Sequence, residues 1–158
     1  MASDSFDDVR DLYQEVILDH GRRPRNAHKP ESFDASAKGD NPMCGDRIEV
    51  WVKYAPDGSI ADTGFKARGC AISVASADLM AETVKGRSKA DTKALFEAFR
   101  EMARTGQCPH CGAELAEPLE RLAPLSGVHE YPSRVKCATL AWHALMAALE
   151  GGKEASSE

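Results

Sequence analysis

The sequence predicts an α+β domain in which helices pack on a small antiparallel sheet of three strands. An amphipathic helical pattern opens the chain over residues 6–19. Two runs that alternate apolar and polar residues follow at 47–55 and 60–68 and predict a β-hairpin. After residue 70 the apolar spacing becomes helical again. Strands followed by helices in this order are typical of the α+β class.

The first helix is predicted from one apolar face and two boundary residues. Ser5 is suited to cap its start, and Gly21 is suited to end it. The apolar face is formed by Val9, Leu12, Tyr13, Val16 and Ile17. The polar stretch that follows is too rich in Pro, Asn and Gly for a helix, but SFDASAK within it can supply a short edge strand.

The hairpin is predicted to bury one face of its first strand. Ile48, Val50 and Val52 alternate with polar residues, and PDGS at 56–59 supplies the turn. Trp51 falls on the polar face of this strand. We expect it either to mark a contact surface or to pack beneath a helix.

Three longer helices are predicted after the hairpin. The first spans 71–84 and is closed by Gly86, and the second begins at Ser88 and breaks at Gly106. A short helix is expected over 114–122. Pro132 suits the first turn of the last helix, whose apolar stripe includes Cys137. Residues 1–150 therefore form a single domain, and residues 151–158 are expected to be a disordered tail.

Charge and composition argue against several classes of partner. The 158-residue chain has a net charge of -5 and no basic stripe of the kind that binds nucleic acid. It has no apolar run near the roughly 20 residues that a membrane span needs, and its acidic start does not resemble a signal peptide. We therefore expect a cytoplasmic protein. Its five cysteines cannot all pair within one chain.

Three of the cysteines are predicted to meet one carboxylate. Because the start of one hairpin strand lies beside the end of the other, Cys44 and Cys70 should be close in space, with Asp46 nearby. If the last helix packs on the hairpin, Cys137 would approach from the helix layer. Three thiolates and a carboxylate are a plausible tetrahedral zinc site. The alternative for Cys137 is a small buried apolar residue without a ligand role.

The motifs NPMCGD, GCAISVASADLM and RVKCATLAWHAL resemble the three cysteine motifs of the IscU/NifU-type iron–sulfur assembly family. LYQEVILDHGRRPRN, and a stretch of about 20 residues before the last cysteine helix, are similar to its SufU branch. The resemblance implies zinc bound by Cys44, Asp46, Cys70 and Cys137. It also implies sulfur transfer from a pyridoxal-phosphate cysteine desulfurase of the SufS kind to the downstream Suf cluster-assembly machinery.

In this interpretation Cys44 is the sulfur acceptor. The resemblance implies that the desulfurase supplies a histidine that displaces Cys44 from zinc. Lys136 stands where IscU-type proteins carry histidine, and it and Arg134 would favour thiolate over thiol. The alternative for both is ordinary charge on a helix surface.

The protein is expected to be a zinc-dependent sulfurtransferase. Two other functions would use the same residues. The cysteines equally suit a scaffold on which an iron–sulfur cluster assembles. A zinc-stabilised domain that only binds the desulfurase is a third alternative. CPHC at 108–111 departs from the family pattern. It is expected to be an inert loop, a redox switch or part of a second metal site.

Overall fold

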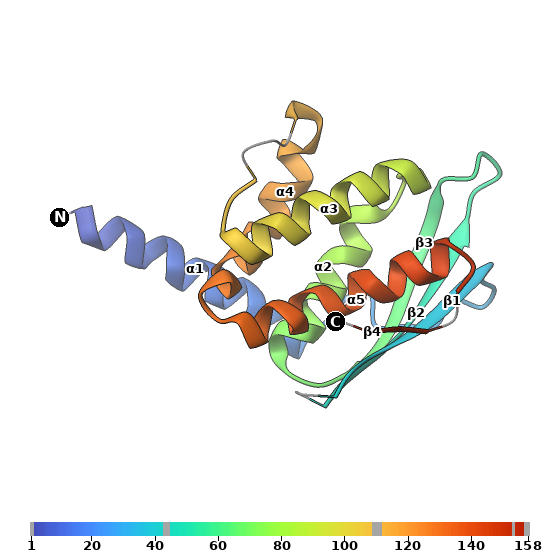
Figure 1. Cartoon of the computed structure of the whole chain (residues 1–158), viewed down its shortest axis with the longest axis horizontal. Helices are drawn as coiled ribbons and strands as arrows, with labels where there is room; N and C mark the ends of the chain where they lie inside the picture. Colours follow the sequence, from blue (N-terminus) through green and yellow to red (C-terminus); the bar gives the residue numbers. More distant parts are fainter. Residues whose placement is uncertain (1, 43–44, 109–111, 153, 157–158) are drawn as a thin grey trace.

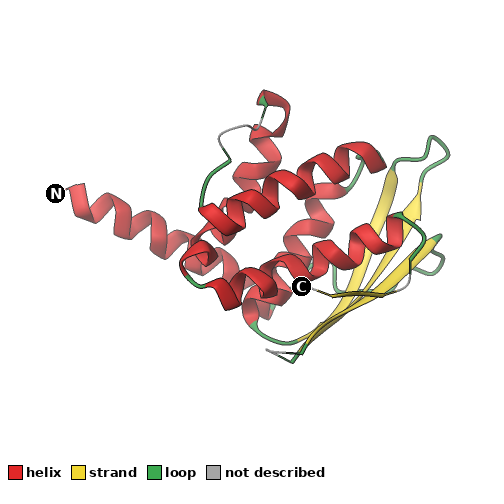
Figure 2. Cartoon of the chain, in the orientation of Figure 1, coloured by secondary structure: helices red, strands yellow, loops and turns green. Residues whose placement is uncertain are grey.

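The computed structural model describes residues 2–42, 45–108, 112–152 and 154–156. A twisted sheet lies at one end of the molecule, and the helices gather on one of its faces (Figures 1 and 2). The predicted α+β class is confirmed. The helices are α1 (Ala2–Arg22), α2 (Ala71–Val84), α3 (Lys89–Thr105), α4 (Ala116–Leu122) and α5 (Pro132–Leu149), with 3-10 turns η1 (Ala113–Leu115) and η2 (Ala123–Glu130).

The sheet contains the three antiparallel strands expected and one more. Its order is β3 (Ile60–Arg68), β2 (Asp46–Tyr54), β1 (Ala35–Asn41) and β4 (Glu154–Ser156). The first three pair antiparallel, whereas β4 runs parallel to β1 and lies opposite Lys38 to Asp40. Residues 154–156 thus form a strand within the segment expected to be a disordered tail. Because β4 pairs with the otherwise open edge of β1, it shields that edge from other strands.

The inner face of the sheet forms the core with α5. Side chains at 46, 48, 50 and 52 of β2 are all buried, as the alternation predicts. Gly39 of β1 is so close to α5 that an added Cβ would lie 3.1 Å from a side-chain carbon of Leu140. At the centre of the helix layer, the ring of Trp142 lies 4.9 Å from that of Phe99. The inner face of the sheet and the buried face of α5 are therefore held in direct contact.

The outer face is covered where Trp51 lies. Trp51 is 5% exposed, and Lys29 Nζ lies 5.6 Å from its ring centroid. The carbonyl oxygen of His28 occupies the space beside Gly64 on the neighbouring strand, where any side chain would overlap it. An irregular segment between α1 and β1 thus crosses this face. Trp51 is neither an exposed contact surface nor packed beneath a helix.

The helix boundaries follow the predicted signals closely. Ser88 Oγ accepts a hydrogen bond from the Asp91 N–H at the start of α3, and Gly106 ends that helix in the left-handed conformation. Pro132 begins α5, as expected. The first helix is longer than predicted, because it begins at Ala2 rather than after Ser5 and continues through Gly21 to Arg22. In the part of the chain that the structure describes, no helix combines the length and hydrophobicity needed to cross a membrane.

Candidate metal centre

Asp46 lies where β2 begins, on the face of the sheet that the helices cover. It is paired across the strands with Asn41, the last residue of β1. The Gly45 N–H donates to the Asn41 carbonyl oxygen at 2.9 Å, which links the residue before β2 to the end of β1. The Asp46 side chain is fully buried. Strand pairing therefore fixes a carboxylate beneath the helix layer.

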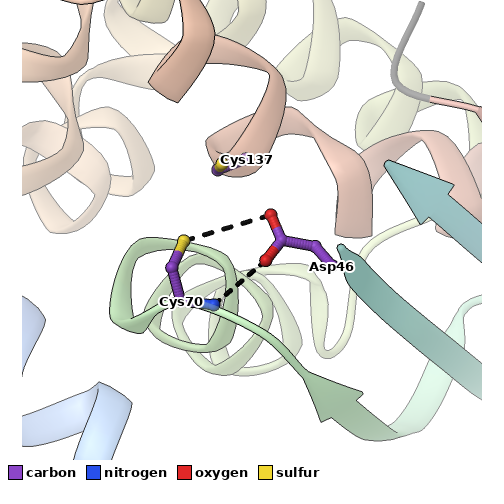
Figure 3. A group of neighbouring side chains, drawn as sticks. All are labelled: Asp46, Cys70 and Cys137. Carbon is purple, nitrogen blue, oxygen red and sulfur yellow. Dashed lines mark hydrogen bonds between the residues drawn. The ribbon is translucent and has the colours of Figure 1, made fainter. Parts of the chain in front are cut away.

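Cys70 meets this carboxylate at the end of β3. As the N-cap residue of α2, it donates its backbone N–H to Asp46 Oδ1 at 3.0 Å. Its sulfur lies 4.0 Å from Asp46 Oδ2 (Figure 3). Gly69 makes this approach possible, since its φ is 152° and any Cβ would overlap Asp46 Oδ1. One carboxylate oxygen is thus held by the backbone, and the other faces the sulfur.

Cys137 approaches from the first turns of α5 and completes a group of three. Its side chain is fully buried, and its sulfur lies 3.7 Å from the Ser133 carbonyl oxygen and 3.9 Å from Asn41 Nδ2. One ligand atom from each of Asp46, Cys70 and Cys137 falls within 4.8 Å of the other two. Figure 3 shows the three side chains converging from β2, from the residue before α2 and from α5.

The arrangement fits a thiophilic metal ion such as zinc. Two sulfurs bound to one tetrahedral zinc lie roughly 3.8 Å apart, so the described ligand atoms need only a small contraction. Among the described residues, no cationic side chain pairs with the buried Asp46 carboxylate. Because a buried carboxylate without a counter-charge is strongly unfavourable, a cation at this position would balance it. Thiolates favour zinc or iron over magnesium or calcium.

The other predicted site residues have different outcomes. Cys44 lies outside the described residues, so its part in the site stays a prediction. Arg134 is exposed on α5, and Lys136 is half-buried. Lys136 lines a groove of about 320 Å³ together with Arg100 and Arg104 of α3. The effect of Arg134 and Lys136 on any thiolate also remains a prediction.

Two residues next to the ligands were not singled out from the sequence. Asn41 is the first residue of NPMCGD, yet its alignment with Cys137 depends on how α5 packs against β1. Gly69 directly precedes Cys70, and its close approach to Asp46 depends on strand register. For Gly69, the signal in the sequence was a glycine that directly precedes a cysteine at a strand-to-helix junction.

A second group of possible ligands is built differently. His20, Asp78 and Glu82 bring ligand atoms within 4.8 Å of one another. However, Asp78 Oδ1 already accepts hydrogen bonds from the backbone N–H groups of Arg25 and Asn26 and from Asn26 Nδ2, while Oδ2 contacts His20 Nδ1. Both oxygens of the buried Asp78 carboxylate therefore already accept hydrogen bonds, and these bonds hold the segment after α1 against α2.

The CPHC segment is mostly outside the described residues. Cys108 itself is disulfide-bonded, whereas Cys70 and Cys137 are not part of any disulfide. A sulfur in a disulfide carries no thiolate charge, so Cys108 does not act as a metal ligand in this state.

The fold and the group of Asp46, Cys70 and Cys137 define a small α+β protein with a candidate metal site built from cysteine and aspartate. Residues 12–138 match the NifU-like N-terminal domain, and the chain belongs to that family. The family expected from the sequence motifs is thereby confirmed.

The relatives include both cluster scaffolds and a sulfurtransferase. The iron–sulfur cluster assembly scaffold protein IscU of Streptococcus pyogenes serotype M1 is 40% identical over 139 residues, which are 88% of this chain and 83% of that protein. The zinc-dependent sulfurtransferase SufU of Bacillus subtilis (strain 168) is 37% identical over 148 residues, which cover 89% of this chain and 93% of that protein.

A solved structure supports the same fold. The iron–sulfur cluster assembly scaffold protein for the SUF system from Fervidobacterium islandicum AW-1 superposes with a TM-score of 0.74 at 29% identity. The match covers 85% of this chain and 94% of that chain.

Proposed function

We propose that this protein is a zinc-dependent sulfurtransferase that accepts persulfide sulfur from a cysteine desulfurase of the SufS kind and supplies it to iron–sulfur cluster assembly in the cytoplasm. The observation that carries the proposal is the convergence of the buried Asp46 carboxylate with the sulfurs of Cys70 and Cys137. The zinc-dependent sulfurtransferase of Bacillus subtilis, at 37% identity, supports the choice of metal and reaction.

Cys44, Asp46, Cys70 and Cys137 would hold the metal. A bound zinc ion supplies positive charge that keeps cysteine sulfur in the thiolate form at neutral pH. Asp46 suits a permanent ligand, because the Cys70 N–H fixes one of its oxygens and burial protects both. Cys44 suits the reactive position, because Pro42 and Gly45 flank it in the sequence and are typical of exposed turns.

The sulfur transfer balances without an external oxidant or reductant. The Cys44 thiolate attacks the terminal sulfur of the persulfide on the desulfurase and forms a new S–S bond. The S–S bond within the desulfurase persulfide breaks, and the desulfurase cysteine leaves as a thiolate. Cys44 then carries the persulfide. Arg134 and Lys136 would favour the anionic sulfur through their positive charge.

The acceptor role is tested by mass spectrometry after incubation with a SufS-type desulfurase and cysteine. We expect a gain of one sulfur on the wild-type chain at Cys44 and none in Cys44→Ala. The double substitution Cys108→Ser and Cys111→Ser is the matched control, because it removes both cysteines outside the proposed ligand set and leaves no new thiol. Normal sulfur gain by Cys44→Ala would show that the acceptor is another residue.

A cluster scaffold is the second candidate function. It is favoured by the Streptococcus pyogenes scaffold protein, which is 40% identical to this chain. Protein purified without oxygen distinguishes the two. A colourless protein with one zinc per chain supports the sulfurtransferase, whereas a brown protein with thiolate-to-iron absorption supports the scaffold. Retained zinc without sulfur gain at any cysteine would indicate a domain that only binds its partner.

A further inference from the structure

Asn41 is a buried polar residue at the end of β1, directly beside the candidate ligands. Its side chain is 1% exposed. It lies on the face of the sheet toward α5 and is paired across the strands with Asp46. A buried amide at the edge of a core needs partners for both its oxygen and its nitrogen. What the Asn41 amide contacts therefore indicates its role.

The nitrogen of this amide faces a ligand sulfur. Asn41 Nδ2 lies 3.9 Å from Cys137 Sγ and donates to it. Asn41 Oδ1 is buried and has no hydrogen-bond partner among the described residues. The protein thus keeps an amide whose oxygen is poorly satisfied, while its N–H is directed at a cysteine 96 positions away.

The charge of the proposed centre explains the use of such a donor. Three thiolates and one carboxylate around Zn²⁺ carry a formal charge of minus two. Cys137 is fully buried, so water cannot stabilise its share of that charge. The Ser133 carbonyl oxygen lies 3.7 Å from the same sulfur. It can accept a hydrogen bond from a thiol, but it cannot donate one to a thiolate. The Asn41 N–H stabilises the sulfur in its anionic form.

We propose that Asn41 is a positioning residue of the metal centre: its amide N–H orients the Cys137 sulfur, stabilises the negative charge on it, and thereby slows the release of the metal. Asn41 and the Cys70 N–H then act on two ligands in parallel, one on sulfur and the other on the Asp46 carboxylate. Hydrogen bonds to metal ligands from surrounding residues commonly alter metal affinity by about 10–100-fold. This inference rests on the proposed metal site.

Two variants separate the hydrogen bond from packing. Asn41→Leu removes the donor and keeps the branched shape of the side chain, whereas Asn41→Asp keeps the size and replaces the N–H by a carboxylate oxygen. We expect zinc to be lost to a competing chelator about tenfold faster from both variants, and fastest from Asn41→Asp. Thr63→Val is the matched control, because it removes another buried, unpartnered side-chain oxygen from a different strand. Its zinc release should match that of the wild type.

A spectroscopic signature distinguishes a bond to sulfur from a general loss of stability. In the Co²⁺-substituted protein, the sulfur-to-cobalt charge-transfer bands should shift in both Asn41 variants and stay unchanged in Thr63→Val. In the wild type, zinc binding should shift the side-chain amide protons of Asn41 downfield in the NMR spectrum. The NMR measurement needs no variant, so it also applies if Asn41→Leu does not fold.

The outcomes for the two proposals are distinct. A wild-type chain that binds no metal overturns the proposed function and this inference with it. A wild-type chain that holds zinc, with Asn41 amide protons that do not move on zinc binding, overturns this inference alone. Folded Asn41 variants with wild-type release rates and wild-type cobalt bands overturn it in the same way.

Discussion

The carboxylate of Asp46 occupies the space that a side chain on residue 69 would need. Gly69 leaves this space open, and its φ of 152° is one that other residues rarely adopt. The same contact brings the Cys70 N–H within 3.0 Å of Asp46 Oδ1. The glycine therefore allows the Asp46 carboxylate on one strand to be held by the backbone at the end of the next.

Gly69→Ala is expected to disrupt the metal centre. The new methyl group must displace the Asp46 carboxylate, which breaks the bond from Cys70 and moves a proposed ligand. We expect less than one zinc per chain by elemental analysis. Gly58→Ala is the control, because Gly58 also has a positive φ, of 88°, but open space around it. It should cost roughly 1–2 kcal/mol of stability and retain the metal. Full zinc retention in Gly69→Ala would contradict the prediction.

Asp78→Ala is expected to loosen the segment that follows α1. The substitution leaves the N–H groups of Arg25 and Asn26 without their acceptor, so unfolding should become easier by roughly 3 kcal/mol in chemical denaturation. Asp19→Ala is the control for the same segment. It removes only the solvent-exposed ion pair with Arg25 and should change stability little. Equal effects of both substitutions would argue against a special role for the buried carboxylate.

Stability should decrease below neutral pH because of His143. Burial, followed by the positive charge of Arg100, lowers the pKa of His143 below its usual value of 6.5, and Glu97 partly opposes this. As the pH falls through 6.5, the unfolded chain takes up a proton before the folded chain does, so the free energy of unfolding falls until the lowered pKa is reached.

Denaturation of His143→Gln at a series of pH values tests this cause. The variant should lose less stability between neutral pH and the lowered pKa than the wild type does. Arg100→Gln should also reduce the loss, because it removes a charge that disfavours the protonated ring. Parallel pH curves for wild type and His143→Gln would exclude His143 as the source.

Removal of residues 153–158 should expose the edge of β1. Hydrogen exchange at Lys38, Gly39 and Asp40 is expected to accelerate, because β4 pairs with these positions. The overall stability should change by about 1 kcal/mol or less. Amides of β3, at the opposite edge of the sheet, serve as the internal control. Unchanged exchange in β1 would show that β4 does not protect it.

Local patterns were sufficient for the elements whose boundaries lie in their own sequence. The strand Ile60–Arg68 and the helix Ala71–Val84 were predicted at their observed limits, because alternation ends where Gly69-Cys70 interrupts it. Ser88 and Gly106 likewise marked α3 through capping chemistry that acts within a few residues. Such signals do not depend on the rest of the fold.

Features that depend on distant segments were not predictable in the same way. Trp51 follows a polar pattern along its strand, yet it is buried because Lys29 and its neighbours cross the outer face. The tail strand β4 is three residues long and too short to give a periodic signal. In the site, chain order and hairpin geometry were sufficient to predict that Asp46 and Cys70 lie close together. The contact between Asn41 and Cys137 could not be predicted, because it depends on how α5 packs.

Because Asp46 is fixed by its pairing with Asn41, the distance along the chain from Asp46 limits where the Cys44 thiol can lie. Cys44 is two residues from Asp46, and two residues of chain span at most about 7 Å between Cα atoms. A cysteine side chain adds roughly 3 Å to this span, so the Cys44 thiol stays within about 10 Å of the Asp46 Cα atom. A partner that exchanges sulfur with Cys44 must therefore bring its own reactive sulfur close to the end of the sheet where Asp46 lies.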